Sequence, residues 1–314
     1  MIVAITGGTG FVGSGLVLRH LAMGDIVRLL SRQSMVKLGA VEIPVSHQGD
    51  LTNENFDLSS FVGGADVLYH CAGEIFYQPK MHLLHVLGTQ KLIQAASGRI
   101  GKWVQLSSVG AYGLQCDGVI TEITPTNPIG VYEKTKLDSD KLVSKAIQEN
   151  AFPGTILRPS NVFGENMNNQ SLYHMIAMIK KGLFFFIGKP GASANYIYVD
   201  NIVEGLIRCG EKSEGKGEIY NLSDYCTIEK FVSIISENLD KPPPRLRFPG
   251  PVVGFASKVF EKIPGFPLTS SRVAALLNRA VYPTDKIEQD LGYSHLVSIE
   301  EGLVKLIAEF KRRA

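Results

Sequence analysis

Residues 6–13, TGGTGFVG, are a glycine-rich turn that joins an apolar stretch, MIVAIT, to a stretch of helical periodicity that begins at residue 11. Gly7 permits the tight turn, Gly10 lets the backbone approach a pyrophosphate, and Gly13 allows the helix to pack closely against the strand. The helix then directs free N–H groups and its positive dipole end toward the phosphates. Because the spacing is GxxGxxG and not GxGxxG, the strand–turn–helix context carries the prediction of a dinucleotide site.

The first half of the chain repeats this alternation of short apolar strands and helices. Nearly continuous apolar strands between helices are typical of a parallel sheet that is covered on both faces. The sequence therefore predicts an open α/β fold. Strands are expected at 1–6, 25–30, 66–71, 102–107 and 154–158, and helices at 11–23 and 80–97.

The pattern changes after Pro159. The stretch YIYVD at 196–200 and a helix at 201–210 predict a return to the sheet, and the chain beyond residue 226 is predicted to be mostly helical. Ser298 and Glu301 have the spacing of a capping box that opens the last helix. The second half is thus expected to add a smaller, mostly helical part.

The composition is that of a soluble globular protein, since 45% of the 314 residues are hydrophobic and 20% are charged, with a formal net charge of +2. The lack of a long basic block argues against a nucleic-acid partner. Four scattered cysteines, without CxxC or zinc-type spacing, predict a reduced, cytoplasmic protein with no metal site. No apolar run reaches the roughly 20 residues of a membrane-spanning helix, and the glycine turn follows the first strand too closely for a cleavable signal.

The end of the second predicted strand indicates which dinucleotide binds. A carboxylate at this point would bind the 2′-hydroxyl of NAD, whereas an arginine accommodates the 2′-phosphate of NADP. The strand ends in RLLSRQ, with Ser31 and Arg32 and no carboxylate, so NADP is the preferred cofactor and NAD the alternative. Asp50 and Leu51, after the third strand, are expected to contact the adenine.

Further motifs follow in order: HCAG at 70–73, SSVGAYG at 107–113, YEKTK at 132–136, RPSNVFG at 158–164, YVDNIVEGL at 198–206 and TDKIEQDLGY at 284–293. With the glycine turn, they make the sequence resemble the extended short-chain dehydrogenase/reductases, the NAD(P)-dependent epimerase/dehydratase group, over nearly the whole chain. The resemblance implies a Rossmann-like doubly wound parallel sheet that holds the cofactor, a smaller and mostly helical substrate domain, and a homodimer. It places the cofactor domain at 1–160 plus about 194–226 and the substrate domain at about 161–193 plus 227–314.

The resemblance implies a catalytic set of Ser108, Tyr132 and Lys136. The chemistry of these residues agrees with that assignment. Tyrosine titrates near a pKa of about 10, and an adjacent ammonium such as that of Lys136 is expected to lower this value. Tyr132 would then give a proton to a carbonyl oxygen during reduction, or take one from an alcohol during oxidation, while Ser108 hydrogen-bonds the same oxygen.

Two sets of contacts with small molecules follow from the motifs and the resemblance. The expected cofactor contacts are Gly7, Gly10, Phe11, Val12, Gly13, Ser31, Arg32, Asp50, Leu51, Cys71, Ala72, Gly73, Ser107, Tyr132, Lys136, Pro159 and Ser160. The expected substrate contacts are Glu74, Ser108, Tyr132 and Asn161.

Three departures from the family pattern bear on the substrate. His85 replaces a common asparagine in the context HVLGT, and its imidazole is either charged near neutral pH or buried and satisfied. Ala194 and Asn195 stand where sugar-nucleotide members have Arg-Asp, so one cation for a diphosphate is missing unless Arg272 or Arg279 supplies it. An apolar stripe at helical spacing is expected to be core or dimer contact, with the wall of a hydrophobic pocket or a membrane-surface helix as alternatives. The stripe comprises Val252, Phe255, Val259, Phe260 and Ile263.

These observations rank four functions. The first is NADPH-dependent reduction of a keto group on a nucleotide-linked sugar, which Asn161 and the motif set favour. An NAD-dependent sugar-nucleotide C4 epimerase is the second, and a dehydrogenase of a hydrophobic, steroid-like alcohol is the third. A dinucleotide-sensing protein without catalysis is the fourth, and the presence of Ser108, Tyr132 and Lys136 argues against it.

Overall fold

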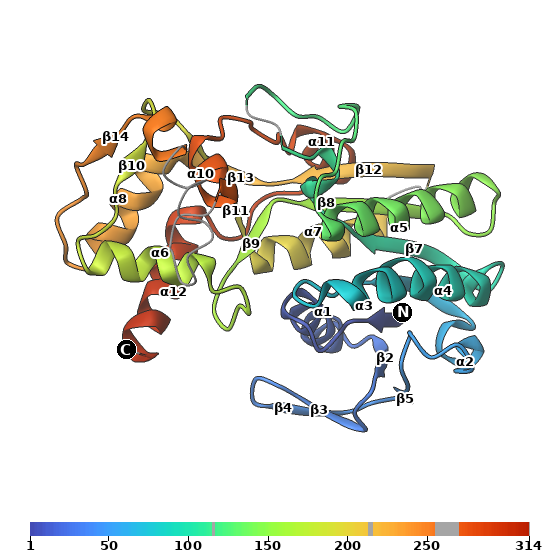
Figure 1. Ribbon diagram of the computed structural model, residues 1–314. Helices are drawn as coiled ribbons and strands as arrows, with labels where there is room; N and C mark the ends of the chain where they lie inside the picture. Colours follow the sequence, from blue (N-terminus) through green and yellow to red (C-terminus); the bar gives the residue numbers. More distant parts are fainter. Residues whose placement is uncertain (115–116, 213–215, 255–269, 314) are drawn as a thin grey trace.

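The computed structural model describes residues 1–114, 117–212, 216–254 and 270–313, and a seven-stranded sheet is its central element (Figure 1). The strand order is β12-β8-β7-β6-β1-β2-β5, and every neighbouring pair is parallel. The predicted α/β, Rossmann-like fold is therefore confirmed. The strands are β1 (Ile2–Thr6), β2 (Ile26–Ser31), β5 (His47–Gln48), β6 (Ala65–His70), β7 (Ile100–Leu106), β8 (Gly154–Pro159) and β12 (Lys216–Leu222).

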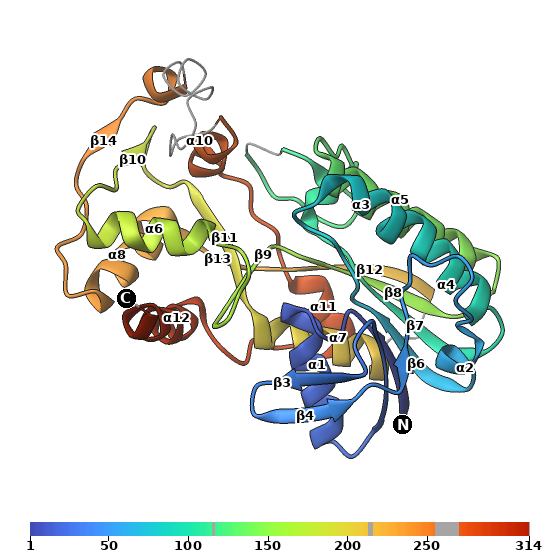
Figure 2. The same cartoon turned by 60° about the horizontal axis from the view of Figure 1, so that its bottom comes forward.

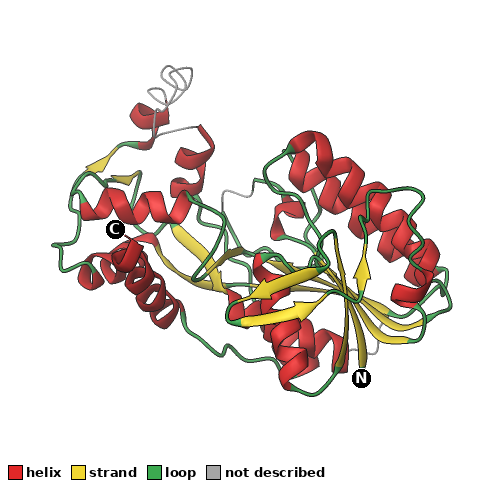
Figure 3. Ribbon diagram, turned by 90° about the horizontal axis from the view of Figure 1, so that it is seen from below, coloured by secondary structure: helices red, strands yellow, loops and turns green. Residues whose placement is uncertain are grey.

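Helices cover both faces of this sheet, as Figure 3 shows. Val3 and Ile5 of β1 belong to the core under α1, α7 and α11, whereas Ala4 belongs to the core under α2, α4 and α5. This division follows from the strand itself, because successive side chains point to opposite faces. The helices are α1 (Phe11–Ala22), α2 (Ser59–Val62), α4 (Thr89–Ala96), α5 (Val131–Gln148), α7 (Val199–Lys212) and α11 (Asp285–Leu291).

The helix predicted at 80–97 is a continuous helical run made of three parts. It begins with α3 (Gln78–His82), continues as a π-helical segment, η1 (Leu83–Gly88), and ends as α4. All three parts are in contact with α5. Such π segments interrupt α-helices mostly at functional sites.

An antiparallel hairpin that the sequence analysis did not predict lies between β2 and β5. Its strands are β3 (Met35–Leu38) and β4 (Val41–Pro44), and it stands away from the main sheet (Figure 1). Val36 and Leu38 are buried whereas Met35 and Lys37 are exposed, so β3 alternates as a half-buried strand should. The four-residue strands are too short for this alternation to be recognised from sequence.

A second part of the molecule lies beside the sheet and is mostly helical (Figure 2). The prediction that 196–200 returns to the main sheet is wrong, because Tyr196, Ile197 and Tyr198 pair with β9 in a separate three-stranded sheet, β13-β11-β9. The edge of the main sheet is taken by β12 instead. These elements are β9 (Asn161–Phe163), β10 (Phe186–Ile187), β11 (Ser193–Tyr198), β13 (Asp224–Thr227), β14 (Arg247–Phe248), α6 (Ser171–Lys180), α8 (Ile228–Asn238), α10 (Ser270–Leu277) and α12 (Ile299–Arg313).

The capping box that opens α12 is confirmed. The backbone N–H of Ser298 donates to Oε2 of Glu301 at 2.9 Å, and the N–H of Glu301 donates to Oγ of Ser298 at 3.2 Å. Of the apolar stripe at 252–263, Val252 is exposed, and Phe255, Val259, Phe260 and Ile263 lie outside the described residues. Within the described ranges, no helix is both long and apolar enough to cross a membrane.

Candidate active site

The glycine turn has no space for a side chain at Gly7 or at Gly13. Gly7 has a φ of 68°, and a Cβ built there would lie 2.6 Å from the backbone nitrogen of Ala72. A Cβ on Gly13 would lie 2.2 Å from the carbonyl oxygen of Gly7. The N-cap of α1 is Gly10, so no side chain occupies the first free N–H groups, and the first turn contains no acidic residue. This cradle lies between β1 and β6, where the strand order reverses, and it fits a pyrophosphate.

Two adjoining hollows extend from the cradle, and every residue predicted to contact cofactor or substrate lines one of them. The first, of about 740 Å³, contains the glycine turn, the catalytic set and Asn161. The second, of about 690 Å³, contains Ser31, Arg32, Asp50 and Leu51. Both include Gly7, Gly10 and the segment 71–74. The two hollows thus form one elongated site. Its parts are named after the roles predicted for them: the adenosine end at Arg32 and Asp50, the catalytic centre at Ser108, Tyr132 and Lys136, and the substrate end from Asn161 to Tyr196.

The adenosine end is basic. Lys37 of the β3–β4 hairpin and Lys80 of α3 line it together with Arg32, and neither lysine was recognised from sequence. Burial by itself would raise the pKa of Asp50, but hydrogen bonds from Thr52 and the charges of Arg32 and Lys80 lower it. Oδ1 of Asp50 accepts from the N–H of Thr52 at 2.9 Å and from its hydroxyl at 2.7 Å, so this carboxylate stays ionised and also forms an Asx turn.

The catalytic centre brings Ser108, Tyr132 and Lys136 to one hollow. Nζ of Lys136 donates to the carbonyl oxygen of Leu106 at 2.6 Å, and Oγ of Ser108 accepts from the N–H of Gly110 at 3.0 Å. The expected lowering of the pKa of Tyr132 by Lys136 is wrong for the protein without cofactor. Burial, with smaller contributions from Glu133 and Asp140, raises that pKa to about 12, because a phenolate is poorly solvated there. Tyr132 is therefore held in its protonated form.

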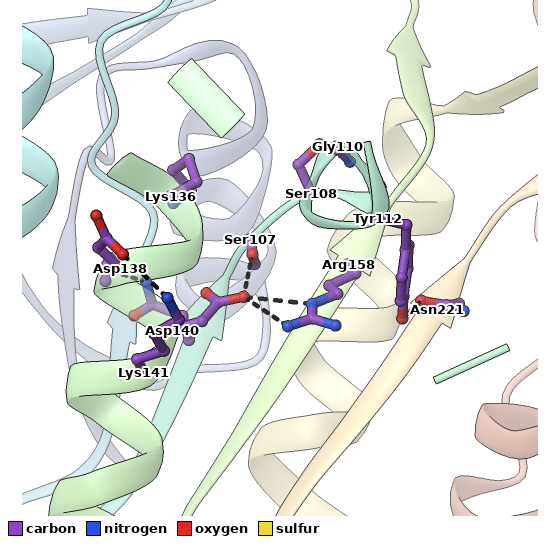
Figure 4. A network of polar contacts seen from close by, with 12 residues as sticks. Ser107, Ser108, Gly110, Tyr112, Lys136, Asp138, Asp140, Lys141, Arg158 and Asn221 are labelled. Carbon is purple, nitrogen blue, oxygen red and sulfur yellow. Dashed lines mark hydrogen bonds and ion pairs between the residues drawn. The ribbon is translucent and has the colours of Figure 1, made fainter. Parts of the chain in front are cut away.

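A buried ion pair holds α5 in place behind this centre (Figure 4). Oδ2 of Asp140 accepts from Nη2 of Arg158 at 3.1 Å and from the hydroxyl of Ser107 at 2.7 Å. The ring of Tyr112 covers the guanidinium with 5.1 Å between ring centroid and Cζ, and its hydroxyl donates to Asn221 at 2.8 Å. Removing one partner of such a pair leaves an uncompensated buried charge. The network therefore fixes the helix that presents Tyr132 and Lys136.

His85 is buried and has both ring nitrogens satisfied. Nδ1 lies 2.8 Å from Oγ1 of Thr135 on α5, and Nε2 accepts from the backbone N–H of Glu74 at 2.9 Å. Burial and the charge of Lys136 lower its pKa to about 3. Of the two expectations for this residue, a charge near neutral pH is thus wrong and the satisfied side chain is observed. His85 also contacts the edge of the Tyr132 ring, with 5.7 Å between centroids, and so links segment 71–77 to α5.

The described lining of the substrate end combines apolar side chains with uncharged polar ones, which are Asn161, Asn168, Asn169, Ser171 and Tyr196. Nδ2 of Asn161 donates to the carbonyl oxygen of Asn195 at 3.0 Å, which fixes its amide. Among the described residues that line the first hollow, the only cation is Lys136, and the carboxylates are Glu74 and Glu133. Residues that the sequence analysis did not single out include Ile75, Phe76, Glu133, Phe163, Met167, Leu172 and Tyr196.

The positions that replace Arg-Asp in the sugar-nucleotide pattern, Ala194 and Asn195, line neither hollow. Asn195 is buried and donates to the carbonyl oxygen of Ala280 at 2.8 Å. Nη2 of Arg279 donates to the carbonyl oxygens of Lys189 and Pro190, and Arg279 does not line either hollow. The side chain of Arg272 lies outside the described part of the chain.

Comparison with known proteins adds a family match, two relatives and a solved structure. The model of the NAD dependent epimerase/dehydratase family matches residues 3–223. The 4-hydroxy-2-methyl-3-oxo-4-farnesyl-3,4-dihydroquinoline-1-oxide ketoreductase of Stigmatella aurantiaca is 27% identical over 95% of this chain and 93% of its own length. The 3 beta-hydroxysteroid dehydrogenase/Delta 5-->4-isomerase of Mycobacterium tuberculosis is 24% identical over 97% of this chain and 89% of its own. UDP-glucuronic acid 4-epimerase from Bacillus cereus, solved in complex with NAD, has a TM-score of 0.77 at 19% identity, covers 100% of this chain and 99% of its own, and shows the fold alone.

Proposed function

The chain belongs to the NAD dependent epimerase/dehydratase family, and we propose that it interconverts an apolar ketone and its secondary alcohol, with NADPH as the reductant. It is an NAD(P)-dependent enzyme of the extended short-chain dehydrogenase/reductase type. One observation carries the choice of substrate. The described lining of the first hollow consists of apolar and uncharged polar side chains and two carboxylates, with no cation besides Lys136 at the catalytic centre.

Tyr132 is the proposed acid. Since burial keeps its pKa near 12, its hydroxyl is protonated at neutral pH and can donate to a ketone oxygen. The hydroxyl of Ser108 already accepts from Gly110, so its own proton is free to donate to the same oxygen. The ammonium of Lys136 has three donors and uses one on Leu106, which leaves two for the cofactor ribose and for stabilising a phenolate. The nicotinamide cofactor, when bound, supplies the hydride.

The preference for NADPH rests on the adenosine end. Arg32 and Lys37 line it, and no carboxylate ends β2, where NAD-specific sites place one. A phosphate monoester carries close to two negative charges at neutral pH, so each nearby cation strengthens its binding. The carboxylate of Asp50 already accepts a hydrogen bond from Thr52, and the charges of Arg32 and Lys80 stabilise its ionised form.

The names of two relatives also favour an apolar ketone or alcohol as the substrate. The Stigmatella enzyme is a ketoreductase of a farnesyl-bearing quinoline oxide, and the Mycobacterium enzyme is a hydroxysteroid dehydrogenase. Reduction of a nucleotide-linked keto-sugar is the second candidate, and the position of Asn161 in the hollow favours it. The described lining of the first hollow offers no cation besides Lys136 for a diphosphate, and its two carboxylates, Glu74 and Glu133, disfavour anion binding.

The test is NADPH oxidation by the purified protein with two kinds of ketone. One kind is apolar, represented by 5α-androstan-3-one and 2-decalone, and the other is a nucleotide-linked 4-keto-6-deoxy sugar. Turnover of an apolar ketone, lost in Tyr132→Phe, is the expected result. Turnover of the keto-sugar alone would replace the proposal with the second candidate, and turnover of neither would overturn both.

A further inference from the structure

Two tyrosines line the first hollow, Tyr132 at the catalytic centre and Tyr196 at the substrate end. Among the described residues, neither hydroxyl has a hydrogen-bond partner. Tyr173 and Tyr220 donate to Glu309 and Asp290, whereas the hydroxyls of Tyr69 and Tyr293 have no partner but are enclosed and line neither hollow. Tyr132 and Tyr196 are only partly buried and line the hollow, so a bound ligand can reach them. A partner supplied by a bound ligand accounts for Tyr196 as it does for Tyr132.

The ring of Tyr196 is held rigidly. It stacks on Phe231 with 4.7 Å between centroids and meets Phe163 edge-on at 6.1 Å. In the parallel pair of β11 and β9, Tyr196 stands directly opposite Asn161. Both therefore point to the same face of the small sheet and into the same hollow.

The two side chains offer complementary groups. The NH₂ of Asn161 is used on the carbonyl oxygen of Asn195, so its Oδ1 remains as an acceptor without a partner among the described residues. Burial raises the pKa of Tyr196 to about 12, which keeps its hydroxyl a donor at neutral pH. A hydroxyl group can accept from Tyr196 and donate to Oδ1 of Asn161, and a carbonyl oxygen can accept from Tyr196.

We propose that Tyr196, together with Asn161, binds a second, uncharged oxygen of the substrate, away from the carbon that reacts. This rests on the proposed function and deepens it, because it defines the substrate as an apolar ketone with a further hydroxyl or carbonyl group. The group is uncharged because, in the described lining, only Glu74, Glu133 and Lys136 carry charge, and Lys136 is at the catalytic centre, where it donates to Leu106. A carboxylate or phosphate at this point would have no counter-ion there.

The experiment measures dissociation constants by calorimetry on the protein saturated with NADP⁺. The probes are 5α-androstan-3-one, 5α-androstane-3,17-dione and 3-oxo-5α-androstane-17β-carboxylate, which differ only at the end remote from the 3-keto group. The variants are Tyr196→Phe and, as a matched control, Tyr225→Phe. Tyr225 lies on β13 of the same small sheet, is exposed, and does not line the hollow.

The wild-type protein is expected to bind the dione about tenfold more tightly than the mono-ketone, as one added hydrogen bond allows, and more tightly than the carboxylate. Tyr196→Phe should remove this difference and leave the mono-ketone unchanged, and Tyr225→Phe should retain it. In turnover, Tyr196→Phe should raise KM for the dione at constant kcat.

An advantage of the dione that persists in Tyr196→Phe overturns the inference. So do tighter binding of the carboxylate, equal loss of both ketones, and failure of the wild-type protein to bind the dione. The proposed function is judged separately, by NADPH oxidation with the mono-ketone. A dione that binds through Tyr196 without any turnover would overturn the function and support the site.

Discussion

The cofactor end and the substrate end of the site are built from different parts of the polypeptide. At the cofactor end the predicted phosphate-binding surface is formed mainly by backbone atoms. Gly7 and Gly13 leave no space for side chains, and the first turn of α1 presents free N–H groups. At the substrate end the surface consists of side chains, such as Tyr196, Met167 and Leu172, from β11 and the loop and helix after β9. A backbone cradle can change only with the fold, whereas side chains on a fixed frame can be exchanged singly. The catalytic centre lies between the backbone cradle of the cofactor end and the side-chain surface of the substrate end.

Breaking the backbone cradle should have the largest effect. In Gly13→Ala, the Cβ would meet the carbonyl oxygen of Gly7 at 2.2 Å, and backbone cannot move aside as a side chain can. We expect the dissociation constant for NADPH to rise about 100-fold and the melting temperature to fall by roughly 5 °C. Nicotinamide fluorescence and thermal unfolding measure the two effects.

Gly15→Ala is the matched control for this variant. It lies on the same helix, and its Cβ would lie 3.0 Å from Cγ2 of Val203, a side chain that can adjust. We expect NADPH affinity close to that of the wild type. Equal losses in both variants would mean that helix packing, and not the cradle, governs binding.

Removing a side chain at the catalytic centre should lower the rate of the reaction without weakening cofactor binding. Ser108→Ala removes the proposed second donor to the ketone oxygen, and kcat for the apolar ketone is expected to fall about 100-fold. NADPH affinity should remain, because the cradle is untouched. Ser108→Thr keeps a hydroxyl and should restore most of the rate in stopped-flow assays, whereas a kcat for Ser108→Ala near the wild-type value would contradict the assignment.

Side chains also contribute at the adenosine end, and their effect should be smaller and selective. Arg32→Ala is expected to weaken NADPH binding by about 10- to 50-fold, as the loss of one charge-assisted hydrogen bond implies, and to leave NADH unchanged. Lys37→Ala should act in the same direction, and Lys145→Ala, on the exposed side of α5, should have no effect. Equal weakening of NADPH and NADH would show that Arg32 does not read the 2′-phosphate.

The same contrast explains what could be predicted from sequence. The glycine turn, the catalytic set and Arg32 are local signals, since each motif has a meaning set by its own strand or helix. Lys37 was missed because it lies on a hairpin of four-residue strands, and Tyr196 because its position depends on β9 and β13. The effect of Lys136 on Tyr132 was mispredicted because sequence spacing does not show that the phenol is buried and that the ammonium donates to Leu106.

His85 provides the smallest expected effect and tests the link between the cofactor end and the catalytic centre. It connects the backbone of Glu74, which lies beside the cofactor cradle, to Thr135 on the helix that carries Tyr132. In His85→Asn the shorter side chain cannot reach both partners. We expect kcat to fall by about two- to tenfold, as loss of one such contact implies, with little change in NADPH affinity.

The pH dependence of stability gives this variant an independent signature. Burial lowers the pKa of folded His85 to about 3, whereas an unfolded histidine titrates near about 6.5. Between these values the unfolded state binds more protons, so the free energy of unfolding decreases as pH falls, by up to about 1.4 kcal/mol per pH unit. His70, whose pKa burial also lowers, adds a term of the same sign that the variant retains.

His85→Asn should therefore show a weaker fall of melting temperature between pH 6.5 and 4.5 than the wild type. Exposed His82, three residues earlier in the same helical run, serves as the control, and His82→Asn should follow the wild-type curve. If the His85→Asn and wild-type curves stay parallel, His85 is not held neutral by the fold. Its contacts with Glu74 and Thr135 would then not be the link between the backbone-built cofactor end and the helix that carries the acid.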